Sequence, residues 1–181
     1  QIDDPSSFNN LKLREKEPLS PKRGQVLVRM HAASLNYRDL LIATGRYRMT
    51  AEIKKAFVPL SDGAGEVAEN GEDAQKFRPG DRVVNTFVPG LIHGYVTKDN
   101  LGKLRGYPND GVLSEYQVFE EEDLVRLPEG ISYGEGACLP CAGVTAWNSL
   151  FCGPQPLLPG QTVLVLGTGG VSILAVQLAH A

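Results

Sequence analysis

Residues Thr162 to Ser172 read Thr-Val-Leu-Val-Leu-Gly-Thr-Gly-Gly-Val-Ser, and this stretch decides the fold of the C-terminal part of the chain. Val163 to Leu166 form an uninterrupted apolar run of the kind found in strands that are buried on both faces. A glycine turn follows, and Ile173 to Ala181 continue as an amphipathic segment. The pattern predicts a strand, a tight turn and a helix in direct succession.

The glycine spacing gives this turn a candidate chemistry. Gly167 allows a tight turn off the strand, and Gly169 lets a pyrophosphate approach the backbone. The N-terminus of the following helix offers free N–H groups to an anion. A dinucleotide site is predicted, with a plain structural turn between strand and helix as the alternative. The candidate cofactor-binding residues of the turn are Gly167, Thr168, Gly169, Gly170, Val171 and Ser172, the last standing at the third glycine position of the pattern.

Composition and charge restrict the class of protein. The 181 residues are enough for one good core, or for one domain and part of another, and 18 basic residues stand against 21 acidic ones. This balance gives no basic face for nucleic acid and no polybasic surface for a membrane. Three cysteines and the lack of a signal-peptide pattern predict a reducing, cytoplasmic location.

The distribution of charge is more informative than its total. After Glu135 no Asp, Glu, Lys or Arg occurs through to Ala181. A segment of this length without charged residues is normally interior. The first strand of a dinucleotide-binding sheet also needs neighbouring strands on both edges, which the sequence does not supply. We therefore expect a chain that is truncated after the first strand and helix of that domain.

The earlier part of the chain reads as short strands separated by Gly and Pro. Glycines 63 and 65 indicate a close backbone approach at the start of one of these strands. The pattern predicts a β-barrel-like domain up to Tyr133. A helix is expected after it, over 134–150, with Pro140 in the early turns that tolerate proline. The other expected elements are strands within 25–32, 59–69, 79–84, 113–118 and 124–127, a short helix over 36–44 and a long irregular loop over 85–110.

The order of these segments resembles the medium-chain dehydrogenase/reductase superfamily, which includes zinc alcohol dehydrogenases and zinc-free quinone reductases. The resemblance implies a mainly β GroES-like catalytic domain over residues 1–133, followed by the beginning of an α/β Rossmann nucleotide-binding domain over 134–181. The matching segments are Ala33-Ser-Leu-Asn-Tyr-Arg-Asp39, Thr44-Gly-Arg-Tyr47, Pro59-Leu-Ser-Asp-Gly-Ala-Gly-Glu-Val67, Pro79-Gly-Asp-Arg-Val83, Leu139-Pro-Cys-Ala-Gly-Val-Thr-Ala-Trp147 and the terminal Gly-Thr-Gly-Gly-Val-Ser.

The resemblance also raises the question of zinc. Catalytic-zinc members carry Cys where Asn36 stands, His where Ser61 stands and sometimes Glu where Asp62 stands. Cys141 matches the position of a third ligand. One thiolate and one Asp do not make the usual zinc site of three protein ligands and an open position. Residues 85–110 contain none of the four cysteines of the structural-zinc lobe. The expected protein is zinc-free, either quinone oxidoreductase-like or zinc-type alcohol dehydrogenase-like.

Cys138 and Cys141 form a Cys-x-x-Cys pair, which also fits a redox disulfide or a zinc knuckle. A knuckle needs a second pair, and only Cys152 remains. A thioredoxin-like motif would follow a strand early in a βαβ unit, whereas this pair precedes the expected Rossmann strand. Packed helix cysteines are the favoured interpretation.

The resemblance implies hydride transfer between a nicotinamide cofactor and a carbonyl, an alcohol or an activated C=C bond. Without zinc, donors that are preorganised over the developing oxyanion must polarise the substrate. Asn36, Tyr47 and Ser61 are the candidate donors, and Asp39 is expected to orient its neighbours. Asn36 can instead be a helix N-cap, and Tyr47 can instead pack at the rim of the barrel.

The remaining expectations concern the cofactor and the partners. Thr145 matches a position near the nicotinamide, or is an ordinary helix residue, and Asp62 either supports the site or belongs to the turn before Gly63. The resemblance favours NADP over NAD, although the discriminating residue lies ~20 residues beyond the glycine turn. The expected partner is a small carbonyl, alcohol or enone, with no nucleic acid and no membrane, and a homo-oligomer stays open for the full-length form. The rival hypothesis is a non-redox binding protein that is derived from the same fold and completed by another chain.

Overall fold

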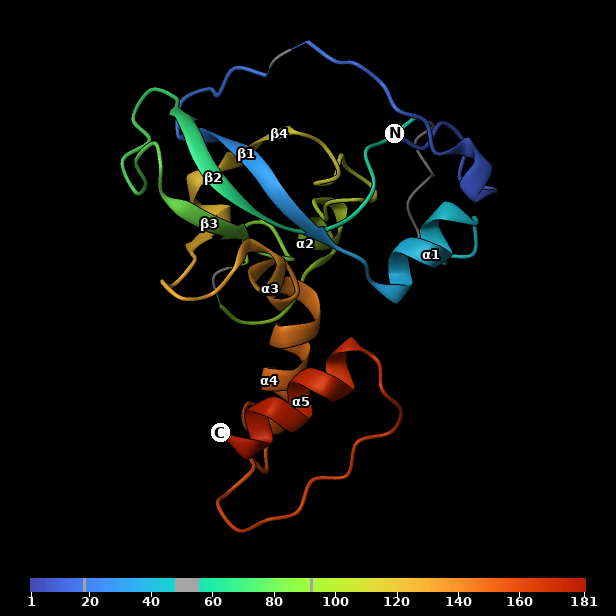
Figure 1. Ribbon diagram of the computed structural model, residues 1–181, viewed down its shortest axis with the longest axis vertical. Coiled ribbons are helices and arrows are strands. Elements are labelled where there is room, and N and C mark those ends of the chain that lie inside the picture. Colours follow the sequence, from blue (N-terminus) through green and yellow to red (C-terminus); the bar gives the residue numbers. More distant parts are fainter. Residues whose placement is uncertain (18, 48–55, 92) are drawn as a thin grey trace.

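The computed structural model describes residues 1–17, 19–47, 56–91 and 93–181, and its main element is one antiparallel sheet (Figure 1). The five strands follow the order β4-β1-β2-β3-β5. The edge strands β4 and β5 are joined by the three-residue helix η2 (Glu121–Asp123), so the sheet must curl until its edges approach. The expected mainly β, barrel-like domain is confirmed. Its strands are β1 (Gln25–Ser34), β2 (Asp62–Asn70), β3 (Arg82–Asn85), β4 (Tyr116–Glu120) and β5 (Leu124–Arg126).

Apolar side chains from the inner faces of the strands form the core. Burial of one such side chain contributes about 1.5–3 kcal/mol to stability. Strands β1 and β2 lie unusually close, because Gly65 has no side chain and a Cβ there would stand 2.2 Å from the Arg29 carbonyl oxygen. This confirms the predicted close backbone approach. The buried core residues are Val26, Val28, Leu60, Val67, Ala74, Phe77, Val83, Val112, Phe119 and Leu124.

Short helices lie around the sheet. The predicted helix over 36–44 is confirmed as α1 (Tyr37–Ala43), which ends before Gly45 at φ +68°. The region 85–110 is largely irregular, as expected, and holds the five-residue α2 (Lys98–Gly102). A 3-10 helix, η1 (Phe8–Asn10), lies near the N-terminus. No helix in the described part of the chain has the length and apolarity that a membrane span requires.

Two predicted strands begin three residues later than expected, β2 at Asp62 and β4 at Tyr116. The residues that precede them bond to each other instead of to the sheet. The N–H groups of Gly111 and Val112 donate to the carbonyls of Val58 and Leu60 at 2.7 and 2.9 Å. This cross-link sets where both strands enter the sheet.

The single helix predicted over 134–150 is divided into three parts. These are α3 (Tyr133–Ala137), the π-helix η3 (Leu139–Gly143) and α4 (Val144–Phe151). Pro140 lies at the start of η3, where it lacks an N–H and its ring crowds the carbonyl four residues earlier. The wider π turn accommodates this defect.

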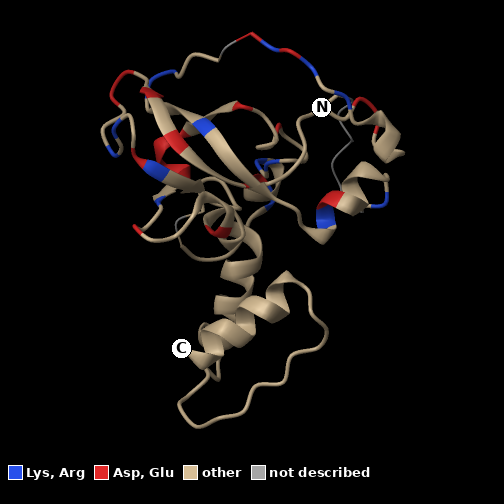
Figure 2. Ribbon diagram, in the orientation of Figure 1, with Lys and Arg blue, Asp and Glu red and all other residues tan. Residues whose placement is uncertain are grey.

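The strand predicted over Val163 to Leu166 is wrong for this chain. The segment forms no regular element, no described residue pairs with it, and Leu164 and Leu166 are each 85% exposed. A strand needs hydrogen-bonded neighbours, and a parallel central strand needs them on both edges. The predicted interior position of the uncharged segment does not hold for residues 152–169, which are exposed or half-buried, whereas Ala137, Ala146 and Ala175 are buried. Figure 2 shows no Lys, Arg, Asp or Glu on α4, on α5 (Gly170–His180) or on their connection, in contrast to the barrel. The helix expected after the glycine turn is confirmed as α5 (Gly170–His180).

Candidate active site

Asp62 is the centre of a buried polar site at the start of β2. Its side chain is 1% exposed. The Oδ1 atom accepts a hydrogen bond from Ser61 Oγ at 2.6 Å, and Oδ2 accepts one from the Cys141 backbone N–H at 2.9 Å. Burial raises the pKa of Asp62, while these hydrogen bonds and the positive charge of Arg38 oppose the rise. The carboxyl group therefore ties the barrel to η3.

Helix α1 brings Asn36 and Asp39 to the same site. Asn36 is the N-cap of α1, as one interpretation of the sequence had it, and its N–H donates to Asp39 Oδ2 at 2.8 Å. Asn36 Nδ2 is buried and makes no well-formed hydrogen bond within the described residues. Its amide nevertheless helps to lower the pKa of Asp62 against the effect of burial. Burial also raises the pKa of Asp39, which is 8% exposed, and the charge of Asp62 adds to this rise.

Arg38 is a buried residue of the site that the sequence analysis quoted only within a motif. Its guanidinium donates to the carbonyls of Arg105 at 3.1 Å and Tyr107 at 3.2 Å. It also lies over the rings of Tyr47 and Phe87, 5.5 and 5.2 Å from their centroids. Its positive charge lowers the pKa of Asp39, Asp62 and Cys141 against the effect of burial. The sequence did offer one indication of this role, because Arg38 stands between the two candidate site residues Asn36 and Asp39.

Cys141 contributes its backbone rather than a thiolate. Burial and then the charge of Asp62 raise the pKa of the thiol to about 11, so it is protonated at neutral pH. Both cysteines of the Cys-x-x-Cys pair were expected to be packed against other residues. Cys141 is half-buried, as expected, whereas Cys138 is exposed at the end of α3. All three cysteines are free thiols. Among the described residues, no three or more His, Cys, Asp or Glu side chains are grouped to hold a metal ion.

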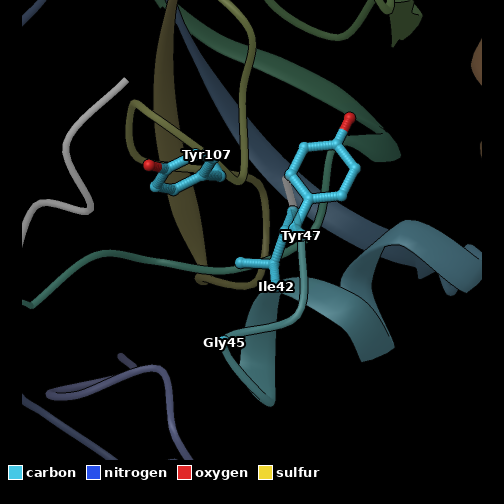
Figure 3. A pocket seen from close by; sticks show the side chains of 4 residues that line it. All are labelled: Ile42, Gly45, Tyr47 and Tyr107. Carbon is cyan, nitrogen blue, oxygen red and sulfur yellow. The ribbon is translucent and has the colours of Figure 1, made fainter. Parts of the chain in front are cut away.

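Tyr47 lies apart from the carboxylates, in a second apolar cluster (Figure 3). Its ring packs edge-to-face against Tyr107, with centroids 6.3 Å apart. The hydroxyl points away from Ile42 and Gly45 in Figure 3, and the depression among these four residues has no room for a water molecule. The alternative that Tyr47 packs at the rim of the barrel therefore describes its position. Its contact with the site is the one between its ring and the Arg38 guanidinium. The cluster is formed by Ile2, Ile42, Ala43, Phe57 and Tyr107, with Tyr47 against it.

The glycine turn has the backbone that a pyrophosphate requires. Gly167 adopts φ +79°, and a Cβ at Gly167 or Gly169 would have no atom within 4 Å. Gly169 is the N-cap of α5, and the first helical bond runs from Ile173 N to Gly169 O at 3.0 Å. The N–H groups of Gly170, Val171 and Ser172 precede this bond and therefore have no partner inside the helix. The residues of the turn fit the phosphate of a dinucleotide.

The turn and the carboxyl site meet at η3. A Cβ on Gly170 would stand 3.6 Å from the Ala142 side chain, and the neighbouring Cys141 bonds to Asp62. Thr145 is exposed on α4, and its carbonyl accepts from Ser149 Oγ at 2.8 Å. The structure thus brings Asn36, Asp39 and Ser61 together, places the turn next to them through η3, and leaves Tyr47 and Thr145 at the periphery.

Comparisons with known proteins identify the family to which this chain belongs. The alcohol dehydrogenase GroES-like domain family matches residues 22–129. A zinc-type alcohol dehydrogenase-like protein of Schizosaccharomyces pombe is 44% identical over 181 residues, which is 99% of this chain and 52% of that protein. The chloroplastic quinone-oxidoreductase QR1 of Triphysaria versicolor is 35% identical, over 88% of this chain and 45% of that protein.

A solved structure gives the same result for the fold. The crystal structure of an NAD-dependent alcohol dehydrogenase has a TM-score of 0.81 and 26% identity over 99% of this chain and 53% of its own. The chain spans about half the length of the curated relatives that it matches. It belongs to the alcohol dehydrogenase GroES-like domain family, and with it to the medium-chain dehydrogenase/reductase superfamily.

Proposed function

We propose that this chain is the catalytic half of an NAD(P)H-dependent oxidoreductase that transfers hydride to or from a carbonyl, an alcohol or an activated C=C bond without zinc. The single observation that carries the proposal is the buried Nδ2 of Asn36, which has no well-formed hydrogen bond in the described residues and lies beside the Asp62 carboxyl. The amide interacts with the Asp62 carboxyl but is not in good hydrogen-bond geometry with it, so it is suited to donate instead to an oxygen that arrives with the substrate.

In this proposal the amide of Asn36 donates to the substrate oxygen as negative charge develops there. Asp39 fixes the start of α1 through the Asn36 N–H and so holds the amide in place. Ser61 already donates to Asp62, so its role is to hold the carboxyl next to the reacting oxygen rather than to donate freely. Tyr47 contributes to the rim of the pocket, and Arg38 supplies the positive charge nearest to both carboxyls.

The donor set does not fit a catalytic zinc ion. An amide and a hydroxyl stand at two of the ligand positions of zinc members, and both are weak neutral ligands for zinc. The third position is Cys141, whose thiol would first have to lose a proton held with a pKa of about 11. We therefore assign the polarisation of the substrate to hydrogen bonds alone.

The nicotinamide cofactor, when bound, supplies or accepts the hydride. Its pyrophosphate would be held by the N–H groups of Gly170, Val171 and Ser172, with Gly167, Thr168 and Gly169 shaping the turn. Thr145 on α4 is the residue that we propose to contact the nicotinamide end. NADP is favoured over NAD by the family resemblance. We further propose a domain boundary between Tyr133 and Gly134. The proposed substrate is a small organic molecule, and the proposed location of the enzyme is the cytoplasm.

The test uses the full-length gene product. We expect NADPH or NADH to bind, which the change in nicotinamide fluorescence measures. We also expect quinones, enones or aldehydes from a panel to oxidise the bound cofactor, which the loss of absorbance at 340 nm measures. Activity should persist after treatment with a chelator, with no stoichiometric zinc in elemental analysis. Binding of neither cofactor would reject the oxidoreductase and favour the non-redox binding protein. Loss of activity on chelation, restored by zinc, would reject the hydrogen-bonding mechanism alone.

A further inference from the structure

Asn85, at the end of β3, bonds to the backbone on both sides of Asp62. Its side chain is 3% exposed. Its Oδ1 accepts the Gly63 N–H at 2.9 Å, and its Nδ2 donates to the Ser61 carbonyl at 2.8 Å and to the Thr86 carbonyl at 2.9 Å. One carboxamide thus holds the residues directly before and directly after the buried carboxyl.

These bonds replace a piece of the sheet. Backbone pairing of β2 with β3 runs from Glu66 opposite Arg82 to Ala64 opposite Val84. Beyond that point the Asn85 side chain extends the connection by taking the Gly63 N–H and then the Ser61 carbonyl. The chain enters this part of β2 from Leu60 at φ +70°, a left-handed conformation that is unfavourable for a leucine.

The position of Asp62 in turn fixes the contact with η3. Its Oδ2 accepts the Cys141 N–H, and the next residue, Ala142, lies against the glycine turn. The path from Asn85 to the proposed cofactor site therefore consists of direct contacts. The hydrogen bonds of the Asn85 side chain within the described residues go to Ser61, Gly63 and Thr86, and not to the turn or to the Asn36 amide.

We propose that Asn85 is a positioning residue that fixes the Ser61 hydroxyl and the Asp62 carboxyl relative to η3 and so sets the catalytic geometry of the site. The expected effect of Asn85 on kcat rests on the proposed function, whereas its expected effect on the contact between Asp62 and η3 does not. Displacement of a catalytic group by about 1 Å costs on the order of 100-fold in rate. The loss should fall on kcat more than on KM, because Asn85 is not placed against the substrate.

Asn70 offers a matched control at the other end of β2. Its Nδ2 also donates to two backbone carbonyls, those of Ala74 at 3.0 Å and Phe77 at 2.8 Å, but it lies far along the strand from Asp62. Asn85→Ala and Asn70→Ala each remove a carboxamide that ties two backbone segments. A general loosening of β2 would affect both variants, whereas positioning of the site affects only the first.

The first measurement is independent of activity. The full-length gene product is labelled with 15N-cysteine, and the Cys141 amide signal is assigned by its loss in Cys141→Ser. We expect Asn85→Ala to shift this signal and to speed its hydrogen exchange, with Asn70→Ala leaving both unchanged. The second measurement is steady-state kinetics, where Asn85→Ala should lower kcat about 10- to 100-fold with little change in KM.

Asn85→Asp covers the case in which Asn85→Ala does not fold. The introduced carboxylate keeps the acceptor for the Gly63 N–H but repels the Ser61 carbonyl, and protonation restores a donor. Asp62, which accepts the Cys141 N–H, also titrates in the natural protein, so the two proteins are compared at each pH. The difference between their Cys141 signals should shrink as the pH falls. A wild-type Cys141 signal in the Asn85 variants, or equal changes in Asn70→Ala, would overturn the proposal. If the natural protein shows no oxidoreductase activity, the proposed function fails and the Cys141 signal alone decides the role of Asn85.

Discussion

The barrel and the C-terminal arm, residues 152–181, contrast in how their apolar residues are used. Leu124 in β5 is 1% exposed and belongs to the main core, whereas Leu166 in the run before the glycine turn is 85% exposed. Both lie in sequence that favours a β-strand. The difference is the presence of neighbouring strands, since β5 pairs with β3 and no described residue pairs with 163–166. Local sequence sets the conformation of a segment, and its partners decide whether it becomes part of a core.

The same leucine-to-alanine substitution in both regions tests whether their apolar residues contribute differently to stability. Leu124→Ala should destabilise the chain by about 2–5 kcal/mol, because it leaves a cavity in the core. Leu166→Ala should change the stability of the 181-residue chain by no more than about 0.5 kcal/mol. Denaturant unfolding of both variants measures the two effects. A loss at Leu166 as large as that at Leu124 would mean that the arm is packed in solution.

Substitutions of Asn36 distinguish a residue that acts on the substrate from one that only caps a helix. Asn36→Ala should lower kcat/KM about 100- to 1,000-fold, as loss of an oxyanion donor does. Asn36→Ser serves as the control, because serine also caps helices but lacks the amide donor. It should keep the stability of the natural protein and lose a comparable share of the activity. An Asn36→Ser variant with full activity would reduce Asn36 to a helix cap.

Two glycine substitutions separate a structural glycine in the barrel from a binding glycine in the turn. Gly169→Ala has free space around its Cβ and should leave stability unchanged, yet weaken NADPH binding by the full-length product about tenfold, or about 1.4 kcal/mol. Gly65→Ala should instead destabilise the barrel, because its Cβ would collide with the Arg29 carbonyl. Thermal unfolding and fluorescence titration measure the two properties. Unchanged cofactor affinity in Gly169→Ala would leave the turn a plain structural one.

The smallest expected effect is a difference in pH dependence. Burial raises the pKa of Asp62 above 3.8, so the folded protein holds this proton at a pH where the unfolded chain has released it. The stabilising contribution is therefore complete below pH 3.8 and is lost as the pH rises through the folded-state pKa. Asp62→Asn removes this contribution but keeps an acceptor for the Cys141 N–H.

The free energy of unfolding, measured from pH 4 to pH 7, tests this point. From pH 7 down to pH 4 the natural protein should gain stability relative to Asp62→Asn. Asp39 is present in both proteins, but the charge of Asp62 contributes to its raised pKa, so the difference between the two profiles reports the titration of this coupled pair. Parallel profiles would show that the Asp62 carboxyl titrates alike in the folded and unfolded states.

Some of the site was predictable from the sequence and some was not. Asn36, Asp39 and Ser61 lie in short motifs, and the structure does bring these three together. Arg38 was missed although its place between the candidates Asn36 and Asp39 was a signal, and Asn85 was missed because nothing in its local sequence shows which way its side chain turns. Tyr47 sits in the same motif region as Asn36, yet its ring packs against Tyr107, a residue 60 positions away in the chain.

The sequence by itself determined the strands of the barrel, the helix α1 and the glycine turn, because alternation, capping and glycine content act over a few neighbouring residues. Only the tertiary structure decided that the helix over 134–150 breaks at η3 and that Cys141 offers its N–H to a carboxyl 79 residues earlier. It also decided that the run before the glycine turn stays unpaired. Hydrogen bonds and burial between distant segments depend on which partners are in reach, and local sequence does not contain that information.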